Sequence, residues 1–216
     1  MPDHRLFAAT YDAALAPAER AGLADRRRRL LAGARGRVLE IGAGTGLNLA
    51  HYPAAVDHLD LVEPDGAMRA RLARRLARWP SAVPVVVHGA SLAEAPLAPA
   101  SFDTVVSTLV LCTVPDLAAA IDHIATLLAP EGELLFLEHG RAPGARGRIQ
   151  SLAGPLWRRL AAGCHLDRDI PVALREAGFV ISDIERFRLA RSGPLLSPAA
   201  QGVAWPRLPS TEPVPV

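Results

Sequence analysis

The apolar positions of the chain fall into two kinds of segment that alternate along its length. The first kind is a short run rich in Val, Leu and Ile, which is typical of a buried strand. These predicted strands cover residues 38–41, 56–62, 83–87, 104–110, 133–137, 179–187 and 201–205. The second kind repeats its apolar residues every three or four positions, which indicates one face of a helix. These predicted helices cover 18–32, 47–53, 68–79, 117–128 and 149–160, with one more between Pro171 and Gly178.

The alternation of strands and helices, joined by short turns, predicts an α/β fold. The arrangement expected is a Rossmann-like, doubly wound parallel sheet with right-handed crossovers. Ligands of such sheets bind outside the carboxyl ends of the strands, where the winding direction reverses. Five segments with candidate site residues fall at these ends, namely 40–46, Glu63, 89–91, 109–112 and 138–139. We therefore expect the functional site along this edge of the sheet.

A glycine-rich turn follows the first predicted strand. Gly42, Gly44 and Gly46 lack a Cβ, so backbone N–H groups there can approach a ligand closely. The spacing is G-x-G-x-G with Glu40 before the first glycine, whereas a dinucleotide site has G-x-G-x-x-G. A carboxylate at that place disfavours a pyrophosphate but accepts hydrogen bonds from an ammonium group, which the methionine end of S-adenosylmethionine (SAM) offers. A tight turn without a ligand is the alternative.

Five further residues are expected to contact SAM. Asn48 lies in the helix after the turn, whose free N–H groups would face a carboxylate. Glu63 follows the second strand, 17 positions after the last glycine of the turn, near the spacing at which an acid meets ribose hydroxyls. Met68 and Ser91 are expected beside the adenine. Tyr11 is expected to fold back over the turn, although packing alone would also explain an aromatic residue there.

The composition is that of a globular protein. The 216 residues, half of them hydrophobic and with a formal charge of +2, suit one domain with a full core. No run reaches the roughly 18 apolar residues of a membrane span, and no signal-peptide pattern is present, so we expect a cytoplasmic protein with peripheral membrane contact left open. Four arginines at 26–29 lie within a helix, which favours a solvated face over a nucleic-acid surface. Cys112 and Cys164 indicate no disulfide framework, and no cluster has metal-ligand spacing.

Longer motifs make the chain resemble the class I SAM-dependent methyltransferases over nearly its whole length. The motifs are V-L-E-I-G-A-G-T-G-L-N at 38–48, L-V-L-C-T-V at 109–114, F-L-E-H at 136–139 and G-C-H-L-D-R-D at 163–169. Within that class they are similar to the alkyl-thiol S-methyltransferases of the methyltransferase-like group and to bacterial phospholipid N-methyltransferases. The resemblance implies a seven-stranded sheet that ends in an antiparallel hairpin. It also implies SAM contacts at Glu40, Gly42, Gly44, Glu63, Ala90 and Leu109.

The chain departs from these relatives at two places. The membrane-anchored thiol methyltransferases have an N-terminal hydrophobic anchor that is absent here. The usual Gly-Asp-Ala after the third strand is Gly-Ala-Ser at 89–91, so we expect backbone and shape to hold the adenine. We expect residues 1–208 to form one domain, with a helical prelude at about 1–35, a small helical cap over the substrate at about 141–170 and a flexible tail at 209–216.

The methyl acceptor is expected to be small and apolar. The segment 149–160, together with Leu195 and Leu196, would roof the pocket, which favours a lipophilic thiol. The alternative acceptor is a natural-product intermediate or a phospholipid head group, methylated on nitrogen or oxygen. A different class of protein, either an NAD(P)-dependent oxidoreductase or a non-catalytic SAM-binding module, is a further hypothesis. His139 ends the fifth strand, where it either acts on the substrate as a base or bonds to the loop backbone. The substrate is further expected to contact Cys112, Trp157, Cys164 and His165.

Overall fold

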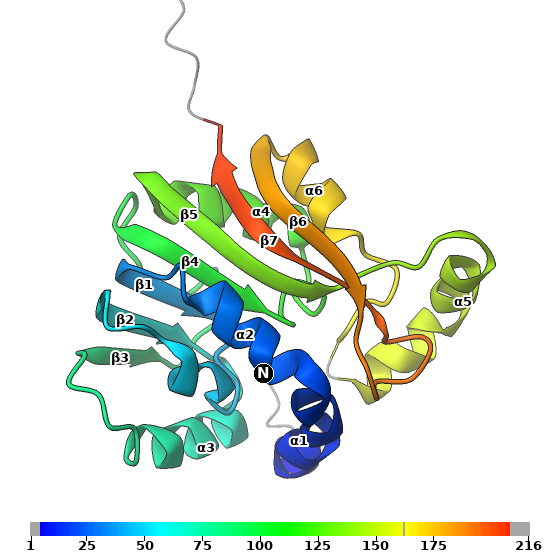
Figure 1. Cartoon of the computed structure of the whole chain (residues 1–216), viewed down its shortest axis with the longest axis horizontal. Coiled ribbons are helices and arrows are strands. Elements are labelled where there is room, and N and C mark those ends of the chain that lie inside the picture. The colour runs from blue at the N-terminus through cyan, green and yellow to red at the C-terminus, as the bar shows by residue number, and fades with distance from the viewer. Residues whose placement is uncertain (1–4, 162, 208–216) are drawn as a thin grey trace, which may run out of the picture.

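One seven-stranded sheet forms the centre of the computed structural model, which describes residues 5–161 and 163–207 (Figure 1). Its strands are β1 (Gly36–Ile41), β2 (Val56–Val62), β3 (Val85–His88), β4 (Phe102–Thr108), β5 (Leu128–His139), β6 (Phe179–Arg188) and β7 (Pro198–Pro206). Their spatial order is β3-β2-β1-β4-β5-β7-β6, and β7 runs antiparallel to both of its neighbours. The predicted doubly wound sheet with an antiparallel last strand is confirmed.

The winding direction reverses between β1 and β4, which are neighbours in the sheet. Ile41 at the end of β1 pairs with Val62 of β2 on one side and with Ser107 of β4 on the other. The turn after β1, the acid after β2 and the loop after β4 therefore meet at one edge. A crevice at such a reversal is where ligands of open α/β sheets bind.

Helices cover both faces of the sheet. They are α1 (Arg5–Ala18), α2 (Ala24–Leu31), the 3-10 turn η2 (Leu47–His51), α3 (Gly66–Leu76), α4 (Leu117–Leu127), α5 (Gly144–Leu160) and α6 (Ile170–Glu176). Successive strand residues point to opposite faces. Leu134 and Phe136 of β5 accordingly join the core beneath α4 and α6, whereas Leu135 and Leu137 join the core that includes residues of α2 and α3.

The N-terminal helices begin earlier than predicted. The sequence predicts a helix from residue 18, but α1 starts at Arg5 and contains Pro17. A π-helical turn, η1 (Glu19–Leu23), then joins α1 to α2. A proline inside a helix removes one backbone hydrogen bond, and the wide turn that follows takes up the irregularity at Gly22, which has a φ of 119°.

The fourth strand ends two residues before the predicted boundary. Leu109 has a φ of 61°, outside the β region, so the chain leaves the sheet after Thr108. Leu109 and Val110 are apolar because they pack against the two cores as part of a loop. The apolar run alone could not reveal this change of direction.

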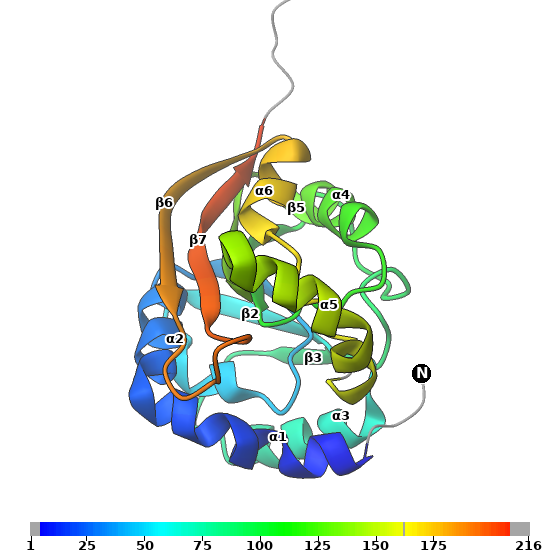
Figure 2. The ribbon, with the colours of Figure 1, turned by 90° about the vertical axis from the view of Figure 1, so that its right-hand side faces the viewer.

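Helix α5 lies outside the two helical layers, on the side where the parallel strands end (Figures 1 and 2). It follows β5, and its Trp157 packs with Cys112 and Cys164 in a small apolar cluster. No helix within residues 5–161 and 163–207 is both long and apolar enough to cross a bilayer. The predicted tail at 209–216 and the side chain of Leu160 lie outside what the structure describes.

Candidate active site

The glycine turn is shaped by backbone conformations that side chains disfavour. Gly42 has a φ of 59°, and a Cβ on it would lie 2.6 Å from the side chain of Val110 in the loop after β4. Gly44 has a φ of 56°, and its N–H donates a 2.8 Å hydrogen bond to Oε2 of Glu63. Glycine is therefore required at both positions. At Gly42 a Cβ would clash with Val110, and at Gly44 the positive φ disfavours other residues.

Glu63 ties the second strand to this turn. Its Oε1 accepts a 2.8 Å hydrogen bond from the backbone N–H of Asp65, while Oε2 accepts the one from Gly44. Burial raises the pKa of the Glu63 carboxyl above its ordinary value, and the two backbone donors oppose that shift. Each carboxylate oxygen has a second lone pair, so Glu63 can still accept hydrogen bonds from ligand hydroxyls.

Glu40 lies beneath the turn in a closed polar network. Its Oε1 accepts a hydrogen bond of 2.9 Å from the amide of Asn48, and its Oε2 accepts one of 2.7 Å from the hydroxyl of Tyr52. Only 2% of the residue is exposed. Burial raises the pKa of Glu40 to about 7, against the opposing effects of its two donors and of Arg27.

Arg27 is a site residue that the sequence reasoning missed. Its Nη1 donates hydrogen bonds of 2.9 Å to Oδ1 of Asn48 and to Oγ1 of Thr108, and its Nε contacts Glu19 at 3.0 Å. The prediction that the arginine run is a solvated helix face is wrong for this residue, which is 3% exposed. Its spacing from two buried leucines of the same helix region, Leu23 and Leu30, was the available signal, because residues three and four apart share a face.

Two adjoining cavities lie at the turn. The larger, of about 240 Å³, has a mostly apolar lining that includes the predicted residues Tyr11, Gly42, Gly44, Glu63, Met68, Ser91 and Leu109. The smaller, of about 20 Å³, has a polar lining that includes Tyr11, Arg27, Glu40, Gly42, Gly44 and Asn48. Of the predicted SAM contacts, Ala90 alone lines neither cavity and packs instead against the core. The arrangement offers a polar end for a charged head group and an apolar end for a larger, flatter body.

Glu138 holds the loop that closes the larger cavity. Its Oε1 accepts hydrogen bonds from the hydroxyl of Ser107 at 2.7 Å and from the N–H groups of Val110 and Leu111 at 3.0 Å. The residue is fully buried, and burial raises the pKa of its carboxyl. Because Val110 lines the cavity, this carboxylate sets the position of one wall.

The predicted substrate residues lie beside the cavities rather than in their walls. Cys112 and Cys164 are buried with their sulfur atoms 3.7 Å apart, next to Trp157. His139 has Nδ1 2.9 Å from the carbonyl oxygen of Leu196, and burial lowers its pKa to about 4. His165 contacts Arg158 at 3.5 Å. From the predicted cap, Ala161 is the residue that lines the larger cavity among those described.

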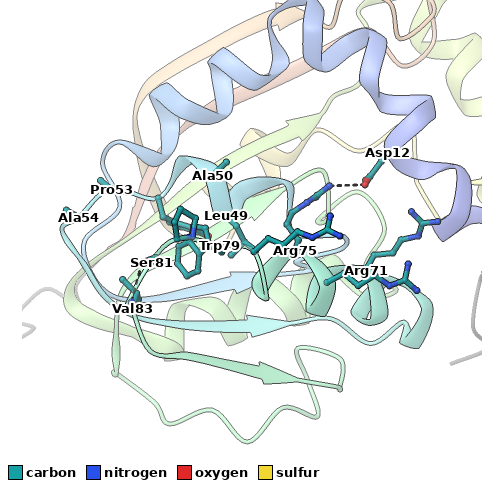
Figure 3. Close-up of a pocket in the computed structure, with 14 residues that line it drawn as sticks. Asp12, Leu49, Ala50, Pro53, Ala54, Arg71, Arg75, Trp79, Ser81 and Val83 are labelled. Atoms are coloured by element: carbon teal, nitrogen blue, oxygen red, sulfur yellow. Dashed lines mark hydrogen bonds and ion pairs between the residues drawn. The ribbon is translucent and has the colours of Figure 1, made fainter.

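A wider depression, of about 840 Å³, lies elsewhere (Figure 3). Its walls include Arg71, Arg74 and Arg75 of α3 and also Trp79, and it lies near the starts of β2 and β3 rather than their carboxyl ends. Arg75 there donates a 2.9 Å hydrogen bond to Asp12, and the Thr45 hydroxyl donates a 2.6 Å hydrogen bond to the same carboxylate. Since the converging acids and the open glycine turn lie at the opposite ends of the strands, we assign the active site to the two smaller cavities.

Comparison with known proteins identifies the family of the chain. A family model described as a methyltransferase domain matches residues 15–183. The chain is 31% identical over 152 residues to the thiol S-methyltransferase TMT1B of Rattus norvegicus, covering 66% of this chain and 59% of that protein. It is 29% identical over 177 residues to the thiol S-methyltransferase TMT1A of Homo sapiens, covering 77% and 69%. A SAM-dependent methyltransferase from Thermotoga maritima, described as a possible histamine N-methyltransferase, aligns with a TM-score of 0.67 at 19% identity over 93% of this chain and 96% of that chain, which is a likeness of fold.

The matched region spans less than two thirds of the rat protein's length. The family match nevertheless includes the glycine turn, both of its acids and the buried arginine beneath it. These are the residues that build the polar cavity. The chain belongs to the methyltransferase domain family.

Proposed function

We propose that this methyltransferase transfers the methyl group of SAM to the sulfur of a small, lipophilic thiol. The observation that carries the proposal is the joined pair of cavities, one polar and one apolar, on either side of the glycine turn. The names of the thiol S-methyltransferase relatives agree with it.

The residues present fit SAM. Glu40 and Arg27 offer opposite charges side by side in the smaller cavity, as an α-amino and an α-carboxylate group require. Glu63 offers lone pairs to ribose hydroxyls, and Met68 and Ser91 offer a wall for the adenine. SAM supplies a methyl group activated by its sulfonium, which a thiolate accepts by in-line displacement. A Cβ on Gly44 would have only the Gly42 carbonyl oxygen near it, at 3.8 Å, so the missing Cβ leaves space for a ligand to approach the backbone there.

The chain's own contribution is positioning, exclusion of water and acceptance of a proton. His139 is neutral near pH 7, and its Nδ1–H donates to the Leu196 carbonyl, so Nε2 keeps a free lone pair. We propose that this nitrogen accepts or orients the thiol proton. A base with a pKa of about 4 is weak. It suits a thiol, whose ordinary pKa is about 8.5, better than an amine or a phenol with a pKa of about 10.

A reducing, cytoplasmic setting is part of the proposal, because Cys112 and Cys164 are free thiols whose sulfur atoms lie in contact. The acceptor would reach the apolar end of the larger cavity, which Val110 and Ala161 line. We expect the acceptor to be lipophilic because the lining of this cavity is mostly apolar.

The test is methyl transfer from labelled SAM to a matched set of acceptors. A thiol, an amine and a phenol that share one hydrocarbon skeleton are compared by kcat/KM, and thermal shifts with SAM, its demethylated product and NAD(P) are measured in parallel. We expect stabilisation by the first two ligands and the highest kcat/KM with the thiol. A higher kcat/KM with the amine or phenol would assign N- or O-methylation instead. Stabilisation by NAD(P) alone would indicate an oxidoreductase. Stabilisation by SAM without methyl transfer to any acceptor would indicate a non-catalytic binding module.

A further inference from the structure

Helix α5 has apolar side chains on two opposite faces. Its inner face includes Trp157, which packs in the cluster with Cys112 and Cys164. Its outer face carries Ile149, Leu152 and Leu156, which are 51%, 83% and 65% exposed. The spacing of three and four residues places these aliphatic groups in one stripe along the helix. These three side chains are exposed and line neither cavity, so they do not roof the pocket as predicted for the segment 149–160.

A stripe of three large aliphatic side chains differs from the single exposed apolar residues that are normal on protein surfaces. Apolar residues on both sides of a helix indicate that both sides are covered in the working protein. Residues 5–161 and 163–207 cover only the inner side of α5. The outer side therefore needs an occupant other than these residues.

The charges around the stripe identify that occupant. The helix contains no Asp or Glu, and Arg146, Arg148 and Arg159 are exposed on it. Arg148 lies four residues before Leu152, and Arg159 lies three residues after Leu156, so both guanidinium groups border the stripe. None of the three arginines forms an ion pair with a residue in the part of the chain that the structure describes. A second copy of the chain would bring the same uncompensated cations to a symmetric contact.

We infer that the outer face of α5 docks on an anionic lipid bilayer. The aliphatic stripe lies in the boundary between head groups and acyl chains, and the arginines contact lipid phosphates, as in amphipathic helices that rest on membrane surfaces. This inference deepens the proposed function, since Ala161 directly after α5 lines the larger cavity and a lipophilic acceptor concentrates in the bilayer. The docked face then lies beside the acceptor end of the site.

The experiment is co-sedimentation of the whole chain with vesicles, in the absence of SAM and acceptor. Vesicles of phosphatidylcholine alone are compared with vesicles that also contain phosphatidylglycerol, at low and high salt. We expect binding to the anionic vesicles that weakens with salt. Leu152→Asp lowers the partition coefficient by about tenfold or more. Val180→Asp, at a half-exposed valine of β6, leaves it unchanged. Arg148→Glu combined with Arg159→Glu lowers binding to the anionic vesicles selectively.

Melting temperatures of all variants establish that they are folded, since each altered side chain is exposed. The inference is overturned if the wild type does not bind anionic vesicles, or if folded Leu152→Asp binds them as the wild type does. It is also overturned if sedimentation velocity shows a wild-type dimer that Leu152→Asp abolishes, because a second copy would then cover the stripe. Methylation of a water-soluble thiol without vesicles is measured separately, so failure of the proposed function is distinguished from failure of docking.

Discussion

The hydroxyl of Tyr52 donates a 2.7 Å hydrogen bond to the carboxylate of Glu40, beneath the glycine turn. This bond favours the ionised carboxylate, yet burial outweighs it and raises the pKa of Glu40 to about 7. The carboxyl therefore exchanges its proton near pH 7. An ammonium group of a ligand prefers the ionised form.

SAM affinity is accordingly expected to depend on pH. Between pH 6 and pH 8 the ionised fraction of a carboxyl with a pKa of about 7 rises about tenfold, and we expect the association constant measured by calorimetry to rise by a similar factor. Tyr52→Phe removes a group that lowers the pKa, so the midpoint should move to higher pH. Glu40→Gln should give weak, pH-independent binding. A flat wild-type profile would contradict the assigned contact.

The same carboxyl predicts the sign of a stability effect. Because its folded pKa lies above its ordinary value of 4.5, the folded state holds a proton that the unfolded chain releases between pH 4.5 and about 7. Glu40 therefore contributes less to the free energy of unfolding as pH rises through this window. Denaturation of Glu40→Gln at several pH values should lack this component. An identical pH dependence in both proteins would show that Glu40 titrates normally.

Substitution of Arg27 is expected to weaken both folding and SAM binding. Arg27→Met leaves Asn48 and Thr108 without a buried donor and Glu19 without its ion pair, at a cost of about 3 kcal/mol in the free energy of unfolding. The neighbouring Arg28 is a matched control, because its side chain is 65% exposed and, among the described residues, forms its ion pair with Asp25 at the surface. Arg28→Ala should change stability by less than about 1 kcal/mol and leave SAM affinity unchanged. Equal losses in the two variants would contradict a specific role for Arg27.

Glu138 is expected to act through the loop that it holds. Glu138→Gln replaces one carboxylate oxygen by an NH2 group, which cannot accept the hydrogen bond that the N–H of Cys112 donates to Oε2, so unfolding should become easier by about 1–3 kcal/mol. Turnover at saturating SAM should fall more than SAM affinity, because the wall with Val110 loses its position. Glu185→Gln is the control, since Glu185 forms a half-exposed ion pair with Arg26. A normal kcat with a raised Kd for SAM would reverse this interpretation.

His139 and Glu63 are expected to separate catalysis from binding. His139→Ala should lower kcat by about tenfold or more while changing the Kd for SAM little. Glu63→Ala should mainly raise that Kd, because it removes the acceptor facing the larger cavity. With a pKa of about 4, His139 contributes no inflection to the kcat profile between pH 5 and 8. Equal losses of SAM affinity in both variants would show that the assignment of His139 is wrong.

Much of the site could be predicted because its signals are local in sequence. The glycine turn, Glu40 and Glu63 follow apolar strands directly, and parallel strands end at one edge of the sheet. The seven strands of the sheet could also be predicted, because each contains a run of apolar residues. In contrast, the outward turn at Leu109 depends on one dihedral angle that the surrounding apolar residues conceal.

The remaining site residues depend on which face of a helix is buried. Arg27 stands among four arginines, and only its position on the leucine face of the helix separates it from the exposed ones. In α5, the spacing of apolar residues predicts which side chains share a face of the helix. It does not predict whether that face contacts the pocket or the solvent. In both cases the decision is made by elements far away in the chain.

The carboxylate of Asp12 links the first helix to the smaller cavity, because it accepts hydrogen bonds from Arg75 (Figure 3) and from the hydroxyl of Thr45, which lines that cavity. Its neighbour Tyr11 lines both cavities, although it precedes the family-matched region. We therefore expect SAM binding in the cavity and ordering of α1 to be coupled, so that each favours the other. Amide hydrogen exchange along α1 should therefore slow when SAM binds. The bound ligand would then stabilise a helix that forms no part of the sheet.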